Sequence, residues 1–335
     1  MTTLIIPQPL VAELLPMGEC IDVMERALAS LARGEAILPL RTMMWTPDRS
    51  GLIAMMPSHV TDPQALGLKV ISVMAANHGT DRDSHQGAVL LFDARTGSLL
   101  AIIDATAITA IRTAAVSGLA TRLLAREDAG DLAILGSGTQ ASTHLAAMRA
   151  VRRLRRVRVC GVSPERARAF ARHHSESLGM TVEAVGSARD AVEGADLICT
   201  ATSSVEPVVK GAWIAPGAHI NAVGACFPAC RELDTEAVVR SRFYCDRRES
   251  VGSEAGDFLI PRREGAIGSD HIVGEIGEVA IGRAPGRSRP DEITLFKSLG
   301  IAVEDVAAAE HIHRRARAVG KGFLVDLGGR RMTYD

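Results

Sequence analysis

The chain has 335 residues, of which 47% are hydrophobic and 23% are charged, and its 38 Lys and Arg nearly balance its 39 Asp and Glu. This length suits two domains that each bury a core, and the composition excludes a disordered chain. The formal net charge of -1 gives no indication of nucleic-acid binding. Only four residues are lysines, so a lysine within an apolar segment is unusual for this sequence.

The six cysteines are few for the length of the chain, and several lie in apolar runs such as residues 197–199. They are typical of reduced thiols in a cytoplasmic protein. The first seven residues lack the basic and apolar regions of a signal peptide, and Asp104 interrupts the apolar run of residues 99–111. We therefore expect a cytoplasmic protein that neither crosses a membrane nor is anchored to one.

The first hundred residues combine one helix with several strands. Ile21, Met24, Leu28 and Leu31 recur at helical spacing, and Gly34 is placed to end that helix. Four β-like segments follow, and the last two are predicted to form a hairpin. These segments are residues 52–56, 66–74, 88–92 and 99–103.

A helix rich in Ala, Thr and Ile, residues 105–125, leads out of this region. From residue 131 strands and helices alternate, which indicates a parallel doubly wound sheet. The amphipathic segment 303–319 is predicted to return the chain to the first domain, and residues 283–290 are predicted as an exposed loop. The predicted strands are 132–135, 157–160, 181–185, 197–201, 219–223 and 243–246, and the helices are 139–152, 164–178 and 188–193.

The most specific local motif is an apolar strand followed by Gly136-x-Gly138-x-x-Ala141 and a helix. Gly136 permits a tight turn, Gly138 lets the backbone approach a pyrophosphate, and Ala141 allows the helix to pack closely on the strand. The flanking strand and helix favour dinucleotide binding, and a tight turn without a ligand is the alternative.

The end of the second strand of this domain lacks the Asp or Glu with which an NAD-specific site holds the ribose hydroxyls. Ser163, with Arg166 or Arg168 nearby, is suited to a 2′-phosphate. The sequence therefore favours NADPH, with NADH as the alternative. In the purely structural interpretation, these arginines lie on a solvated helix face.

Two basic residues lie in apolar segments. Lys69 is in a strand where its ammonium group needs a partner or a shifted pKa, and Arg112 is in the long helix. Either residue alone is more often part of a structural ion pair than of a ligand site. Together with Arg41, they supply three cations for a carboxylate and a phosphate, and Ser84 and His85 add polar groups before the hairpin.

No metal site is predicted. Cys226 and Cys230 lie four positions apart without a second pair at zinc spacing, and the His pairs at 173–174 and 311–313 lie on helices rich in Arg and Ala. The segment 218–228 follows a strand and ends in small residues, which would let a flat ring lie against the backbone.

Taken together, these segments resemble the ornithine cyclodeaminase and μ-crystallin family over nearly the whole chain. The residues that carry the resemblance are 56–57, Lys69, 84–86, 90–92, 109–115, 136–140, 217–224, 231–234 and 294–300.

The resemblance implies an α/β substrate and dimerisation domain, residues 1–120 joined by the C-terminal helix 303–335, and a Rossmann domain, residues 121–302, that holds NAD(H) or NADP(H). It also implies a homodimer. The predicted substrate-binding residues are Arg41, Lys69, Arg112 and His85, and Lys69 is also the predicted catalytic residue. The predicted cofactor-binding residues are Ser84, Arg112, Thr113, Gly136, Ser137, Gly138, Thr139, Gln140, Ser163, Thr200, Thr202, Val223 and Ser298.

Two positions depart from the cyclodeaminase pattern. A cyclodeaminase of this family carries a glutamate in its version of residues 52–57 and a catalytic aspartate in its version of residues 224–226. This chain has Ala54 and Cys226 there. Cyclodeamination requires proton transfers that a carboxylate serves. The resemblance is closest to the μ-crystallin-like branch, which is associated with NAD(P)H reduction of cyclic ketimine carboxylates.

We therefore expect an NAD(P)H-dependent oxidoreductase that reduces small cyclic imino acids such as pyrroline-2-carboxylate or piperideine-2-carboxylate. The alternatives are an ornithine or lysine cyclodeaminase, an alanine-type amino-acid dehydrogenase, and a cofactor-bound protein that sequesters a small ligand.

Overall fold

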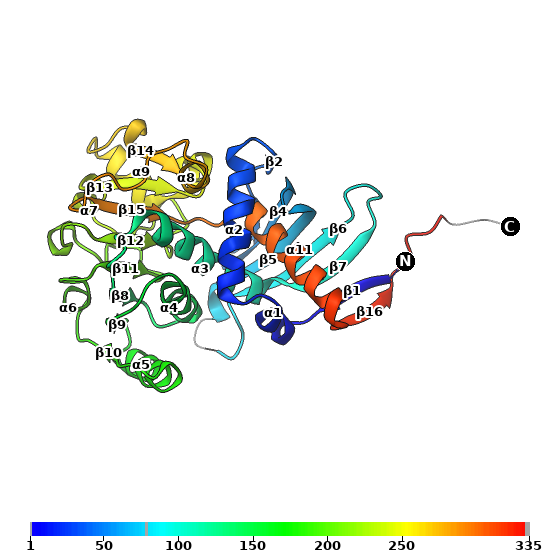
Figure 1. Cartoon of the computed structure of the whole chain (residues 1–335), viewed down its shortest axis with the longest axis horizontal. Helices are drawn as coiled ribbons and strands as arrows, with labels where there is room; N and C mark the ends of the chain where they lie inside the picture. Colours follow the sequence, from blue (N-terminus) through cyan, green and yellow to red (C-terminus); the bar gives the residue numbers. More distant parts are fainter. Residues whose placement is uncertain (1, 78–79, 332–335) are drawn as a thin grey trace. The chain divides into compact units, whose positions relative to one another are not determined.

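The computed structural model describes residues 2–77 and 80–331. The chain forms two compact units, one of residues 1–112 with 301–335 and one of residues 113–300 (Figure 1). The predicted domain limits were residues 120 and 302. In the structure the first limit follows Arg112, within α3 (Ala105–Leu124), so this helix belongs to both units.

A mixed sheet of eight strands forms the first unit, in the order β16-β1-β7-β6-β5-β4-β2 with β3 paired to β4. β1 runs parallel to β7, and the other neighbours are antiparallel. The strands are β1 (Thr2–Ile6), β2 (Ala36–Ile37), β3 (Thr42–Trp45), β4 (Gly51–Thr61), β5 (Gln64–Met74), β6 (His85–Phe92), β7 (Leu99–Asp104) and β16 (Phe323–Asp326).

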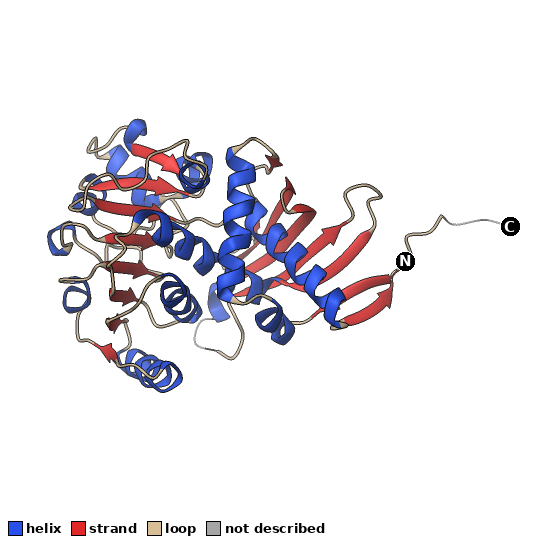
Figure 2. Ribbon diagram, viewed as in Figure 1, coloured by secondary structure: helices blue, strands red, loops and turns tan. Residues whose placement is uncertain are grey.

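Helices cover one face of this sheet (Figure 2). Every second residue of β5 from Ala65 to Ile71 is buried, which is the period of a strand with one covered face. α11 (Ala302–Val319) crosses β4, β5 and β6, α2 (Met17–Ala32) packs on α11, and α1 (Gln8–Leu14) lies against β7. Gly67 permits this close approach, because a Cβ there would lie 3.0 Å from Cγ2 of Val306.

The C-terminal segment differs from the predicted helix over 303–335. α11 ends at Val319, where Gly320 takes a left-handed conformation with φ of 66°. The chain then forms β16, which pairs antiparallel with β1. All four residues of β16 are exposed, so they carry no alternating pattern from which a strand is predicted.

A parallel sheet of eight strands forms the second unit, in the order β10-β9-β8-β11-β12-β15-β13-β14. Chain order reverses between β8 and β11, which makes the carboxyl ends of these strands the expected ligand site of a doubly wound fold. The predicted Rossmann class is confirmed. The strands are β8 (Asp131–Leu135), β9 (Arg156–Cys160), β10 (Val182–Ala184), β11 (Leu197–Thr200), β12 (His219–Ala222), β13 (Ser241–Cys245), β14 (Ile272–Glu275) and β15 (Ile293–Lys297).

The helices of this unit follow the strands. They are α4 (Thr139–Val151), α5 (Pro164–Leu178), α6 (Ala188–Val192), α7 (Thr235–Val239), α8 (Arg248–Glu254), α9 (Gly256–Arg263) and α10 (Ile276–Ala280). Single 3₁₀ turns lie at Gly211–Trp213 and Ser269–His271, and a third, Ala75–Asn77, belongs to the first unit.

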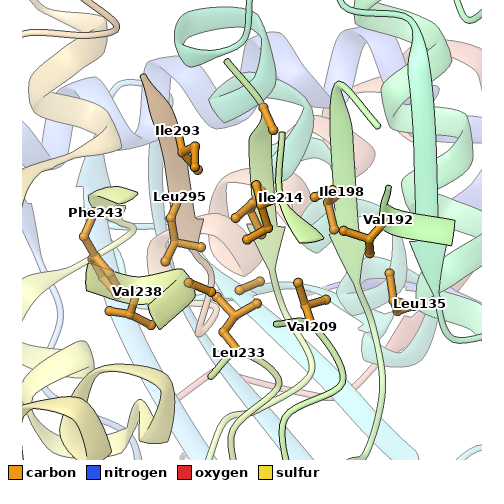
Figure 3. Close-up of a cluster of buried hydrophobic side chains, with 14 of the residues drawn as sticks. Leu135, Val192, Ile198, Val209, Ile214, Leu233, Val238, Phe243, Ile293 and Leu295 are labelled. Atoms are coloured by element: carbon orange, nitrogen blue, oxygen red, sulfur yellow. The ribbon is translucent and has the colours of Figure 1, made fainter. Parts of the chain in front are cut away.

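Apolar side chains fill one face of the parallel sheet (Figure 3). Ile198, Leu295 and Phe243 from three strands pack with Val192 of α6 and Val238 of α7. β15, which supplies Leu295, is buried along its whole length. A central strand of this kind shows no alternation, which explains why the sequence pattern did not predict it as a strand.

Residues 283–290 form the predicted loop, although Arg287 turns inward and donates hydrogen bonds to the main-chain oxygens of Leu124 (2.8 Å) and Ala218 (3.2 Å). Among the described residues, no helix combines the length and the apolar composition that crossing a lipid bilayer requires.

Candidate active site

Lys69 and Arg112 come together beneath the first turn of α11. Lys69, on the covered face of β5, is 2% exposed, and its Nζ lies 2.9 Å from Oδ2 of Asp305 and 3.5 Å from Oγ1 of Thr109. Arg112, in α3, is 3% exposed. Its Nε donates to Oδ1 of Asp305 at 2.8 Å and its Nη1 donates to Oε2 of Glu304 at 2.6 Å.

Two carboxylates that were not among the predicted site residues complete this cluster. Glu304 and Asp305 are wholly buried in the first turn of α11, where the helix dipole favours negative charge. The signal was present, since two adjacent acids interrupt the apolar run of residues 301–309. Acids that are buried in such a run need cationic partners, and the structure supplies Lys69 and Arg112.

Burial and the neighbouring charges shift the pKa values of Lys69 and Arg112. Burial lowers the pKa of Lys69 to about 8; the Asp305 carboxylate acts against burial, and the charges of Arg112 and Arg41 act with it. Burial also acts to lower the pKa of Arg112, but its two carboxylate partners outweigh this effect and raise the pKa. In this cluster Arg112 therefore stays charged and Lys69 has a pKa of about 8, to which the charge of Arg41 contributes.

Ser84 and His85 lie elsewhere on the same sheet. His85 pairs with Val73 at the start of β6, four residues from the pairing of Lys69 with Val89. That separation is about 13 Å along a strand. His85 is exposed, and its Nδ1 lies 2.9 Å from Oγ of Ser84. The structure therefore does not bring His85 into the Lys69 cluster.

The glycine-rich turn follows β8 in the second unit. Gly136 has φ of 116°, and a Cβ on this residue would lie 2.4 Å from the main-chain oxygen of Ala201. By contrast, apart from Gly138 itself and its two chain neighbours, no atom of the described residues lies within 4 Å of a Cβ built on Gly138, the residue before α4. The absence of a side chain at Gly138 thus leaves room at the helix N-terminus for a ligand, as the pyrophosphate interpretation requires.

Two buried polar atoms at this edge of the sheet have no hydrogen-bond partner among the described residues. They are Oε1 of Gln140, in the first turn of α4, and Oγ of Ser298, directly after β15. The first turn of α4 also lacks a side-chain cap. A dinucleotide offers both the anionic phosphates that suit the helix N-terminus and the polar groups that suit Gln140 and Ser298, so these residues fit the predicted cofactor.

The remaining predicted cofactor residues differ in exposure. Val223, after β12, and Thr113, next to Arg112 on α3, are buried, Ser137 is partly exposed and Thr139 is exposed.

Glu232 joins the ends of β11 and β12 from a wholly buried position. Its Oε2 accepts from Oγ1 of Thr200 and from the N–H of Gly224, both at 2.7 Å. Its Oε1 accepts from the N–H (2.7 Å) and Oγ1 (2.8 Å) of Thr202. The hydroxyls of Thr200 and Thr202 thus donate to Glu232, and the cofactor contacts of these two residues stay a prediction.

A second ion pair supports Glu232. The N–H of Glu232 donates to Oδ1 of Asp257 at 2.8 Å, and Oδ2 of Asp257 lies 2.9 Å from Nζ of Lys297. Burial raises the pKa of Glu232, and the charge of Lys297 acts to lower it. Glu232 lies in the segment 231–234, on which the family resemblance partly rests, but the pattern alone did not indicate its role.

An acid lies in the first turn of α5, shortly after the strand end that is predicted to bind a 2′-phosphate. Oγ of Ser163 donates to Oε2 of Glu165 at 3.0 Å and accepts from the N–H of Arg166 at 3.3 Å, which makes Ser163 the N-cap of α5. Arg168 pairs with Oε1 of Glu165 at 3.2 Å. Glu165 is not recognisable from the usual pattern, because it lies in the first helical turn rather than at the strand end itself.

The two positions at which the chain departs from the cyclodeaminase pattern are Ala54 and Cys226, and neither carries a carboxylate. Ala54 is buried on β4, on the face that also carries Lys69. Cys226 is partly exposed, and its thiol donates to the main-chain oxygen of Val223 at 3.4 Å. Across residues 2–77 and 80–331, no three His, Cys, Asp or Glu side chains are grouped so that they could hold a metal ion.

Comparisons with known proteins identify the family of this chain. The model of the ornithine cyclodeaminase/mu-crystallin family matches residues 1–320. Ketimine reductase mu-crystallin of Mus musculus is 39% identical over 296 residues, which cover 88% of this chain and 90% of that protein.

Two solved structures match nearly the whole chain. Thermococcus litoralis Delta(1)-pyrroline-2-carboxylate reductase, in complex with NADH and L-proline, has a TM-score of 0.94 and 41% identity, covering 96% of this chain and 100% of the other. An archaeal alanine dehydrogenase dimer with bound NAD has a TM-score of 0.92 and 31% identity, covering 98% and 100%. The predicted resemblance is thus confirmed, and the chain belongs to the ornithine cyclodeaminase/mu-crystallin family.

Proposed function

We propose that this protein reduces small cyclic ketimine carboxylates, such as pyrroline-2-carboxylate or piperideine-2-carboxylate, to the corresponding cyclic amino acids. The observation that carries the proposal is the buried cluster of Lys69 and Arg112, with the charge of Arg41 acting on it. The absence of a carboxylate at Ala54 and Cys226 argues against cyclodeamination. The names of the mouse and Thermococcus relatives describe the proposed chemistry.

The substrate is an anion with a C=N bond, and each cation of the cluster has a role toward it. Arg112, which keeps its charge, and Arg41 hold the carboxylate. Lys69 in its ammonium form polarises the imine and provides a proton to the ring nitrogen, which becomes N–H as the C=N bond is reduced. Its pKa of about 8 leaves most of the side chain protonated at pH 7 and allows the proton to be replaced from solvent after turnover.

A reduced nicotinamide dinucleotide, when bound, supplies the hydride for the imine carbon. The turn at Gly136 and Gly138 and the first turn of α4 would hold its pyrophosphate, and Gln140 and Ser298 would contact its polar groups. We propose NADPH as the preferred cofactor, with NADH also accepted. Ser163 near the ribose position supports NADPH, and the ion pair of Arg168 with Glu165 offsets the negative charge there.

A homodimer and a cytoplasmic location complete the proposal. The face of the first sheet opposite α2 and α11 carries apolar side chains that stay partly exposed, which favours an interface. These include Leu66, Leu68, Val70, Leu90 and Ile102. The archaeal alanine dehydrogenase relative is a dimer. The six cysteines form no disulfide in the described part of the chain, which suits a reducing compartment.

The decisive experiment is a cofactor-oxidation screen with identified products. Cyclic ketimines with NADPH or NADH, pyruvate with ammonia, and ornithine with NAD are supplied in parallel. We expect cyclic amino acids from the ketimines. Alanine from pyruvate and ammonia at a higher kcat/KM would make the protein an amino-acid dehydrogenase, proline from ornithine would make it a cyclodeaminase, and cofactor binding without turnover would leave a ligand-binding protein.

A further inference from the structure

We propose that Asp305 is a positioning residue, which keeps the Lys69 ammonium group charged and holds it at a set place beside Arg112. The kinetic consequence rests on the proposed function, whereas the effect on Lys69 itself rests on the geometry of the first unit alone.

Asp305 contacts both cations of the cluster at once. Its Oδ2 lies 2.9 Å from Nζ of Lys69, and its Oδ1 accepts from Nε of Arg112 at 2.8 Å. Since β5, α3 and α11 each contribute one of these residues, a single carboxylate sets the spacing of two cations that come from different elements. Glu304, the preceding residue, directs Oε2 to Arg112 at 2.6 Å.

Among the groups that act on Lys69 in the described structure, Asp305 carries the negative charge that balances its ammonium group. Thr109 and Arg112 face it from α3, Arg41 acts from the segment before β3, and Asp305 faces it from α11. Burial and the two guanidinium charges all favour the neutral amine, and the carboxylate of Asp305 favours the ammonium form. Without that carboxylate, these three effects act in one direction, and Lys69 loses its proton at a lower pH.

This assignment predicts a specific pH dependence. If the ammonium form acts on the substrate, kcat/KM for ketimine reduction falls as pH rises through the pKa of Lys69. The Asp305→Asn variant lowers that pKa, so its decline begins at a lower pH. At pH 7.5 we expect its kcat/KM to be at least ~10-fold below that of the wild type.

The chain offers a direct measurement, because it has only four lysines. In protein labelled with ¹³C at lysine Cε, four signals report on Lys69, Lys210, Lys297 and Lys321, and Lys69→Met assigns the first of them. The signal of Lys69 is followed against pH in the wild type and in Asp305→Asn. We expect its titration to move to lower pH in the variant, while the other three signals stay in place.

Glu304→Gln is the matched control. Glu304 is adjacent to Asp305, equally buried and equally charged, and its carboxylate is directed to Arg112. This variant should weaken substrate binding and raise KM while moving the Lys69 titration much less than Asp305→Asn does. Circular dichroism and thermal unfolding check that both variants fold, because Glu304 and Asp305 lie in the first unit.

The outcomes separate this inference from the proposed function. An unchanged Lys69 titration in folded Asp305→Asn, or an equal shift in Glu304→Gln, overturns the role of Asp305. A wild type that reduces no ketimine overturns the proposed function, while the lysine titration still decides on Asp305. If Asp305→Asn does not fold, Asp305→Ser replaces it: this smaller side chain also removes the negative charge, so an unchanged Lys69 titration there also overturns the inference.

Discussion

The carboxylate of Glu232 and the backbone of Gly224 are fitted to each other at the carboxyl end of β12. The N–H of Gly224 donates to Oε2 at 2.7 Å, and a Cβ on residue 224 would lie 2.5 Å from Oε1 and 2.0 Å from the main-chain oxygen of Thr202. The buried Glu232 thus fixes the position of the backbone at Gly224. This residue follows β12 at the carboxyl end of the sheet, where a Rossmann domain binds its ligand.

Glu232→Gln should therefore weaken cofactor binding. The amide replaces one acceptor oxygen by a donor, which leaves N–H groups of Thr202 or Gly224 without a partner. We expect the Kd for NADPH to rise about 10-fold or more and Tm to fall, as measured by fluorescence titration and thermal unfolding. Glu236→Gln, an exposed site four residues on, should change neither. Wild-type cofactor affinity in folded Glu232→Gln would contradict this role.

Lys69→Met should leave cofactor binding near the wild-type value and lower kcat/KM by at least ~10²-fold, about 2.7 kcal/mol of transition-state stabilisation. The methionine keeps much of the side-chain volume on β5 but cannot hold or protonate the substrate. Steady-state kinetics with a cyclic ketimine, alongside NADPH titration, make the measurement. Near-normal turnover would remove Lys69 from the active site.

Cofactor choice is predicted to depend on the charge at the start of α5. NADPH should bind more tightly than NADH, and Ser163→Asp should level or reverse that preference by repelling the 2′-phosphate. Glu165→Gln should act in the opposite sense and strengthen NADPH binding relative to NADH. Glu176→Gln, later on the same helix, is the control and should alter neither Kd. A wild type that prefers NADH would show that the interpretation of the strand end before Ser163 is wrong.

Cys226 occupies the place of the cyclodeaminase aspartate, and we predict that it does no base chemistry. Its thiol donates to the main-chain oxygen of Val223 at 3.4 Å, and no carboxylate stands in its place. Cys226→Ser should retain most ketimine reduction, and Cys226→Asp alone should not produce proline from ornithine, because Ala54 also lacks a carboxylate. Ammonia and proline assays make the test. Stoichiometric ammonia from ornithine with wild-type protein would reject the reductase assignment.

His144 should make the second unit less stable in acid. Burial lowers its pKa from an ordinary value of 6.5 to about 4, while its Nδ1 contacts the main-chain oxygen of Gln140 at 2.7 Å. Above pH 6.5 the ring is neutral in both the folded and the unfolded state. As pH falls from 6.5 to 4, the unfolded chain binds the proton first, which costs about 3 kcal/mol of stability. Urea unfolding against pH should show a weaker dependence in His144→Gln, whereas His173→Gln, at an exposed site, should match the wild type.

The elements that were predicted correctly are those with clear local sequence signals, such as residues that begin or end a helix. α5 was predicted at residues 164–178 and is found there, because Pro164 suits the first helical position and Gly179 adopts the left-handed conformation that ends the helix. By contrast, β15 is buried without alternation and β16 is exposed without alternation, so neither has the periodicity on which prediction depends.

The sequence indicated the basic residues of the candidate site but not its acidic residues. Lys69 and Arg112 were conspicuous as charges in apolar segments, but the carboxylates that face them come from a helix far along the chain. Arg112 and Asp305 are 193 positions apart, and no local pattern reports a contact at that separation. Glu165 and Glu232 were missed for a related reason: their roles follow from where their side chains point.

The placement of α11 also affects how the protein is made. The first unit is interrupted after Arg112 and resumes at Ile301, so the second unit emerges from the ribosome before the first has its covering helix. At about 5–20 residues per second, translation of the 193 positions from Arg112 to Asp305 takes roughly 10–40 s. During that interval the apolar face of β5 and the ammonium group of Lys69 have no native cover. The nascent first unit is thus an expected client of chaperones, and a chain truncated before α11 is an expected target of proteolysis.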